Sequence, residues 1–119
     1  MLWFAVALGG AVGATARYAV ARLFPIHPDA FPWATFTVNV LGCLAIGWCL
    51  AHVERDRFSP EVRVALVTGL LGSFTTFSTF GAESFALLQN GRGGLAAVYV
   101  ASSFLLGLGA VALGRAVAA

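Results

Sequence analysis

The sequence predicts an all-α membrane protein, with one domain over residues 1–119 that carries four transmembrane helices. The chain is 60% hydrophobic and only 10% charged, whereas an average soluble domain has roughly 25% charged residues. Four long runs are almost free of charge, and each reaches or nearly reaches the roughly 20 helical residues that cross a hydrocarbon core. The connections between these runs are short, so we expect no second domain.

The four runs follow one another between short turn-forming segments. The first lacks a basic region before its apolar stretch, so we interpret it as a span and not as a secretory signal. Proline and glycine mark the connections, because both favour turns over continued helix. The predicted spans are 1–24, interrupted by Arg17, then Ala30–Val53, Val64–Ala82 and Gly93–Gly114, with connections at Pro25–Trp33, His52–Pro60 and Asn90–Gly94.

Charge and residue chemistry exclude several classes of protein. Seven arginines, no lysine and five acids give a net charge of +2, too small and scattered for a nucleic-acid-binding face. Cys43 and Cys49 lie in one apolar run, and their Cα atoms in a helix are about 9 Å apart, beyond disulfide reach. His27 and His52 fall in or beside the predicted connections with no second ligand at metal spacing, and no nucleophile has an adjacent base. We expect no enzyme activity, no nucleic-acid partner and cysteines that serve as small packing residues.

The arginines divide almost equally between the two ends of the predicted spans. One end receives Arg55, Arg57, Arg63 and Arg115, and the other receives Arg17, Arg22 and Arg92. A clear excess of Lys and Arg on one side normally determines orientation. Because four against three is a weak bias, we favour dual topology, in which the chain inserts both ways and pairs with its inverted copy. A weakly biased monomer with a single topology is the alternative.

Polar residues lie within the first two predicted spans. Arg17 shares a helix face with Gly9 and Gly13, and small residues at that spacing let helices pack closely. The arginine can reach the lipid headgroups or attract anions in a vestibule. Asn39 lies well inside the second span, where its carboxamide must find partners. It can form an interhelical hydrogen bond, or its N–H groups can bind a passing anion.

The third predicted span combines glycines and hydroxyls in the segment Gly69–Phe80. These residues can divert backbone hydrogen bonds, so we predict that the third helix is broken near its middle, at Gly72 to Thr75. Carbonyls freed there are hard oxygen ligands suited to a cation such as sodium. Phe77 and Phe80 then share a helix face. They are either ordinary lipid-facing or core aromatics, or ring edges that favour an anion.

A polar stripe continues into the fourth predicted span. Glu83, the only acid in the apolar core of a span, either marks a helix end or hydrogen-bonds to a neighbouring helix. Tyr99, Ser103 and Gly107 recur at helical spacing on one face. Such a stripe is either a polar track for an ion or an adhesive between helices.

Essentially the whole chain resembles one known family, the Fluc fluoride channels, also called CrcB proteins. The resemblance rests on Gly9-Gly10 through Gly13-Ala14 with Arg17-Tyr18, on Thr37-Val-Asn39-Val-Leu-Gly42, on Gly69 to Phe80 with Glu83, and on Tyr99. The run from Thr75 to Phe80 is the part most specific to this family.

The resemblance implies both a fold and an activity. Members are antiparallel, dual-topology homodimers of four-helix subunits with two pores, and they release cytoplasmic fluoride passively across the cell inner (plasma) membrane. A structural sodium would lie at the dimer centre, bound by the backbone carbonyls of Gly72 and Thr75. Arg17 would face a vestibule. The pore positions would correspond to Asn39, Phe77, Ser78, Thr79, Phe80, Glu83, Tyr99 and Ser103. Many relatives carry a hydroxyl at the position of Gly107, so the inner end of the track departs from the pattern.

Physical chemistry agrees with this implied activity. Fluoride is small and strongly hydrated, so a pore must replace its water with convergent donors. A small dual-topology multidrug or cation exporter is the alternative function, but such exporters need a carboxylate deep in the first span, where this chain has only Arg17. An assembly subunit without transport would explain the glycines but not the clustered hydroxyls. We therefore expect fluoride, the lipid bilayer and an inverted copy of the chain as partners.

Overall fold

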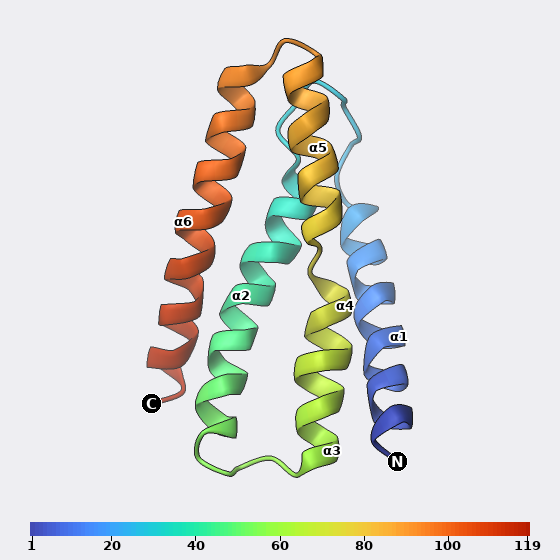
Figure 1. The fold of residues 1–119 in the computed structure, drawn as a ribbon, viewed down its shortest axis with the longest axis vertical. Coiled ribbons are helices and arrows are strands. Elements are labelled where there is room, and N and C mark those ends of the chain that lie inside the picture. The colour runs from blue at the N-terminus through green and yellow to red at the C-terminus, as the bar shows by residue number, and fades with distance from the viewer.

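The computed structural model describes all residues, 1–119, and consists of helices and their connections (Figure 1). The elements are α1 (Leu2–Ala21), α2 (Trp33–Val53), α3 (Pro60–Arg63), the π-helix η1 (Val64–Leu71), α4 (Gly72–Phe74), α5 (Phe77–Gln89) and α6 (Gly93–Val117). The membrane spans are α1, α2, the combined segment Pro60–Gln89, and α6, each long and apolar enough to cross a membrane. The prediction of an all-helical, four-span membrane protein is confirmed.

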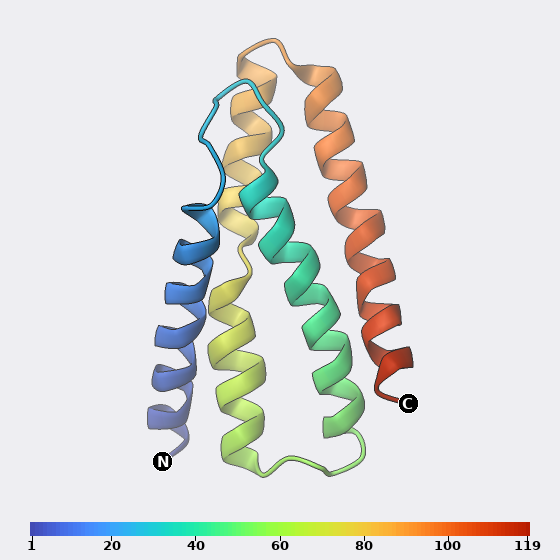
Figure 2. The same ribbon diagram turned by 180° about the vertical axis from the view of Figure 1, so that it is seen from behind.

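The spans run up and down in sequence order. Both termini and the α2–α3 connection lie at one end, and the α1–α2 and α5–α6 connections lie at the other (Figures 1 and 2). α1 packs mainly against η1 and α4, whereas α2 packs mainly against α6. The longest dimension is 48 Å, which matches a bilayer of about 40–45 Å with its headgroups.

The third span extends beyond both ends of the predicted run Val64–Ala82. At its start, the Ser59 side chain accepts a hydrogen bond from the Val62 amide, 3.3 Å away. Pro60 occupies the first turn, where a missing N–H is harmless. At the other end the helix continues past Glu83 to Gln89. The interpretation of Glu83 as a helix end is therefore wrong.

Glycines allow the helix backbones to touch at two interfaces. Gly9 and Gly13 of α1 are buried, and a Cβ on either would overlap a backbone carbonyl of η1. From the opposite side, a Cβ on Gly69 would lie 2.7 Å from a carbonyl oxygen of α1. Gly47 and Gly114 allow an equally close approach of α2 and α6. Dispersion contacts between closely packed backbones hold helices together where lipid removes the hydrophobic driving force.

Two residues with extended backbone separate α4 from α5. Thr75 has φ −85° and ψ 159°, and Thr76 has φ −149° and ψ 120°. The predicted interval began at Gly72, but Gly72 is helical and only Thr75 of that interval is extended. The two halves of the span keep roughly one direction across these residues (Figure 1).

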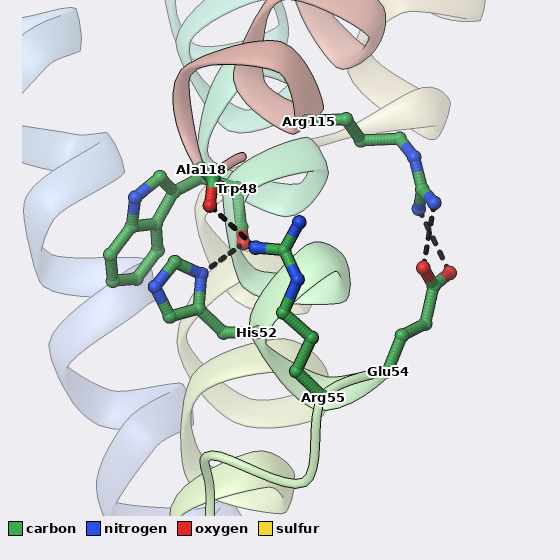
Figure 3. Close-up of polar contacts among 6 residues, drawn as sticks. All are labelled: Trp48, His52, Glu54, Arg55, Arg115 and Ala118. Carbon is green, nitrogen blue, oxygen red and sulfur yellow. Dashed lines mark hydrogen bonds and ion pairs between the residues drawn. The ribbon is translucent and has the colours of Figure 1, made fainter.

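Polar contacts join the C-terminus to the α2–α3 connection (Figure 3). The Arg115 guanidinium donates to both carboxylate oxygens of Glu54, at 2.9 and 2.7 Å, and this pairing lowers the Glu54 pKa. Arg55 donates to a carbonyl near the end of the chain. His52 stacks on Trp48 with ring centroids 4.0 Å apart. The charged side chains at this end of the protein are therefore partly paired with one another.

The close approach of α1 and η1 predicts that one added methyl group at Gly13 is harmful. Gly13→Ala should destabilise the protein by about 1–3 kcal/mol, because its Cβ would overlap the Leu70 carbonyl. Gly109→Ala is the matched control, since nothing lies within 4 Å of a Cβ there. Thermal unfolding of both variants in detergent measures the difference. Equal midpoints for the two variants would contradict the packing described here.

Candidate functional site

The Asn39 carboxamide of α2 binds both backbone groups of Thr76. Its Nδ2 donates to the Thr76 carbonyl at 3.1 Å, and the Thr76 amide donates to Oδ1 at 2.8 Å. In a continuous helix the Thr76 amide would donate to the carbonyl four residues earlier. The interhelical hydrogen bond considered for Asn39 is thus present, and it involves one of the two N–H groups on Nδ2.

The threonine hydroxyls complete the helix ends on either side of this pair. Thr76 Oγ1 accepts from the Thr79 amide at 3.2 Å, which caps the start of α5. The same oxygen donates to Thr79 Oγ1 at 3.0 Å and lies 3.5 Å from Ser78 Oγ. Thr75 Oγ1 donates to the Leu71 carbonyl at 3.0 Å. The hydroxyls of Thr75 and Thr76, two of those that led us to predict a break, therefore bind backbone groups of the helices on either side of the extended residues.

Gly72 and Thr75 each have a carbonyl whose usual helical donor is engaged elsewhere. The donor to Gly72 would be the Thr76 amide, which binds Asn39. The donor to Thr75 would be the Thr79 amide, which binds the Thr76 hydroxyl. Backbone carbonyls without helical donors are oxygen ligands of the kind that sodium prefers, so the residues present fit the implied cation.

Arg17 binds the end of α4. Its Nε donates to the Ser73 carbonyl at 3.0 Å, and the side chain is half-buried. A cation at the C-terminal end of a helical run compensates for carbonyls that lack helical donors.

Glu83 joins three helices through its two carboxylate oxygens. Thr35 Oγ1 of α2 donates to Oε1 at 2.7 Å, and the Tyr99 hydroxyl of α6 donates to Oε2 at 2.7 Å. Tyr99 is fully buried and Thr35 is 6% exposed. The sequence analysis did not select Thr35. Its spacing of one helical turn before Asn39, on the same face of α2, was the available signal.

The two phenylalanines lie in different surroundings. Phe80 packs against Tyr99, with ring centroids 5.1 Å apart, and against Phe77 at 5.9 Å. Phe77 is 83% exposed on the single chain. Phe80 is thus partly a core aromatic, whereas Phe77 contacts the Phe80 ring but is otherwise largely exposed.

Most of the predicted site residues gather around two hollows of about 370 Å³ each. The first hollow lies beneath the α1–α2 connection, and its polar lining includes Arg17, Thr35, Thr76, Thr79 and Glu83. The second hollow is lined by residues that include Asn39, Cys43, Gly72, Thr75, Thr76, Phe77, Phe80 and Ser103. Thr76 lines both, so the hollows are adjacent.

Of the predicted residues Ser103, Tyr99 and Ser78, only Ser103 lines one of these hollows. The Ser103 Oγ in the second hollow is buried and has no hydrogen-bond partner. Tyr99 lines neither hollow and acts on the site through its bond to Glu83. Ser78 is exposed and also lines neither hollow.

Comparison with known proteins identifies the family. Residues 4–115 match the family model described as CrcB-like protein, Camphor Resistance (CrcB). A fluoride-specific ion channel FluC from Methylobacillus flagellatus is 48% identical over 87% of this chain and 83% of the relative. The protein of the same name from Deinococcus radiodurans is 46% identical over 99% of this chain and 95% of its own. A third, from Chloroflexus aurantiacus, is 49% identical over 92% and 89%.

A match to 4–115 covers nearly all of the membrane spans, including the extended residues between α4 and α5 and every residue that lines the two hollows. The chain therefore belongs to the CrcB family.

Proposed function

We propose that this protein is a fluoride-selective channel that exports cytoplasmic fluoride passively across the cell inner membrane. The observation that carries the proposal is the pair of adjacent hollows at Thr76. Hydrogen-bond donors and aromatic rings from α2, α5 and α6 line these hollows. The relatives are named fluoride-specific ion channels, which supports a channel and not an enzyme.

The lining of the second hollow suits a small, strongly hydrated anion. It contains no carboxylate and offers the remaining N–H of Asn39, the unpartnered hydroxyl of Ser103, and the rings of Phe77 and Phe80. Aromatic edges carry the positive end of the ring quadrupole. Together these groups replace water around a fluoride ion, whereas the larger chloride requires a wider arrangement of donors.

The first hollow would supply the entrance to this path. Arg17 adds positive charge there, which raises the local concentration of anions. Glu83 is the only carboxylate in its lining, and both of its oxygens accept hydrogen bonds. Because Glu83 is engaged in this way and α1 contains no acid, an exporter that exchanges protons or cations has less support.

A sodium ion bound by the carbonyls of Gly72 and Thr75 would contribute fixed positive charge beside the second hollow. The extended backbone at Thr75 and Thr76 serves this purpose, since it frees both carbonyls from helical donors. Two neutral carbonyls are fewer ligands than a sodium ion takes. A second copy of the chain would supply the others.

An inverted second copy also explains the surface of the subunit. Phe77 is exposed beside the second hollow, and large apolar side chains cover much of the remaining surface. With arginines divided four to three between the two ends, orientation is only weakly specified. We propose an antiparallel, dual-topology homodimer. In each copy the third span would be broken near its middle, at the extended residues Thr75 and Thr76.

Replacing the Asn39 amide with a carboxylate tests the anion path. Asn39→Asp removes the donors on Nδ2, including the bond to the Thr76 carbonyl, and an ionised carboxylate repels anions. We expect fluoride efflux from liposomes to fall at least tenfold, equivalent to about 1.4 kcal/mol on the barrier. A fluoride electrode measures the efflux from equal amounts of dimer. The control is Gln89→Glu, the same chemical change at an exposed position. Normal efflux through assembled Asn39→Asp would remove Asn39 from the path.

The aromatic edges are tested by substitutions that keep apolar bulk. Phe77→Ile and Phe80→Ile should each lower fluoride efflux, by up to about tenfold, because an aromatic edge interaction contributes about 0.5–1.5 kcal/mol. Phe85→Ile on the same helix is the control, since Phe85 is exposed and lines neither hollow. Dimer content is checked by size-exclusion chromatography. Should both site variants conduct like the control, the two rings are packing residues only.

Dual topology predicts that orientation can be controlled by a few charges. Three lysines added to the α2–α3 connection should force one orientation, and three added to the α5–α6 connection should force the other. Each variant alone should lose fluoride export, and coexpression of both should restore it, because only the mixture forms antiparallel pairs. Fluoride resistance of cells that lack their own exporter is the measurement. Full export by either variant alone would exclude the antiparallel dimer.

A further inference from the structure

A cysteine lines the second hollow one helical turn beyond Asn39. Both residues lie on the same face of α2, and both contribute to the lining. On α6, which packs against α2, the lining residues are Phe104 and Ser103, and the buried hydroxyl of Ser103 has no partner. The next residue on that face of α6 is Gly107, which is buried. The polar stripe of Tyr99 and Ser103 on α6 therefore has no side chain at its next position, Gly107.

The Cys43 thiol occupies the space beside Gly107. A Cβ built on Gly107 would lie 3.4 Å from Cys43 Sγ, and a hydroxyl beyond that Cβ would compete with the sulfur for the same volume. A thiol is a weak S–H donor. Gly107 of α6 has no side chain that could donate a hydrogen bond here. The Cys43 thiol of α2 supplies a donor from the opposite wall of the hollow.

We propose that Cys43 extends the polar lining of the anion path at the level of Gly107 and makes the second hollow a binding site for soft, thiol-seeking cations such as Ag⁺. This inference rests on the proposed function. Binding of Ag⁺ forms a silver–sulfur bond and releases the thiol proton to water. The resulting silver thiolate adds no net charge, but its bulk would obstruct the hollow that fluoride must cross.

The second cysteine provides an internal control. Cys49 is 6% exposed and lines a different hollow, of about 540 Å³, among apolar residues of α2, η1 and α6 that include Trp48 and Leu113. None of the polar site residues lines that hollow. Removal of the Cys49 thiol should therefore leave fluoride efflux and its response to silver unchanged.

Silver inhibition separates the two cysteines. Fluoride efflux is measured from liposomes in chloride-free buffer, with and without micromolar silver nitrate. We expect silver to slow efflux at least tenfold through the wild-type protein and through Cys49→Ser, with recovery after addition of dithiothreitol. Cys43→Ser keeps a donor but not the soft sulfur, so its efflux should be insensitive to silver.

An exchange of the donor between the two helices tests the role of the thiol in conduction. Cys43→Ala should lower efflux about threefold, the effect expected for one weak hydrogen-bond donor. Cys43→Ala with Gly107→Ser places a hydroxyl in the vacated volume and should restore the rate. A residue with a merely structural role would not be rescued from the opposite helix in this way.

The outcomes distinguish this inference from the proposed function. Absence of fluoride efflux through the untreated wild-type protein would contradict the proposed function, and the role of Cys43 with it. Normal efflux that silver does not inhibit, or silver inhibition that persists in Cys43→Ser, would overturn the silver site alone. An unchanged rate in Cys43→Ala, or failure of Gly107→Ser to rescue it, would overturn the role of the thiol in conduction.

Discussion

The structure depends on the paired hydrogen bonds between the Asn39 carboxamide and the backbone of Thr76. Backbone groups without partners cost several kcal/mol each in a bilayer core, so a span can be interrupted only where the protein supplies substitutes. Asn39 supplies one acceptor and one donor at the same residue, and the hydroxyls of Thr75 and Thr76 supply further bonds on either side. Side-chain hydrogen bonds therefore stabilise the two extended residues within the third span.

This interaction also positions the rest of the site. Asn39 can reach Thr76 only because α2 approaches the third span closely at Gly42, where a Cβ would overlap the Thr75 side chain. The same approach places the lining of α2 beside Phe77 and Phe80 of α5. On the far side of Thr76, Arg17 binds the end of α4, and Glu83 ties α5 to α2 and α6. Both hollows are lined by Thr76, the residue whose backbone Asn39 binds.

Local patterns in the sequence were sufficient for the four helical spans but only partly for the site. Apolar runs predicted four spans, and the spacing of Gly9 and Gly13 predicted close packing, because both signals depend on neighbours along one helix. The partners of Arg17 and Glu83 could not be predicted without knowing which helices meet. The helix-end interpretation of Glu83 was wrong because α5 continues to Gln89. The extended residues lie at Thr75 and Thr76 because Asn39 binds the Thr76 backbone. Patterns along a single helix do not predict a contact between two helices. Thr35 was missed because its partner, Glu83, also lies on another helix.

The central claim is that Asn39 takes the place of a helical hydrogen bond at Thr76, and solid-state NMR of the labelled protein in bilayers tests it most directly. The account predicts a through-space contact between the Asn39 side-chain carbonyl carbon and the Thr76 amide nitrogen, extended-backbone chemical shifts at Thr75 and Thr76, and a Thr76 amide that exchanges slowly with water. Helical shifts at both threonines, with no contact between Asn39 and Thr76, would contradict the account.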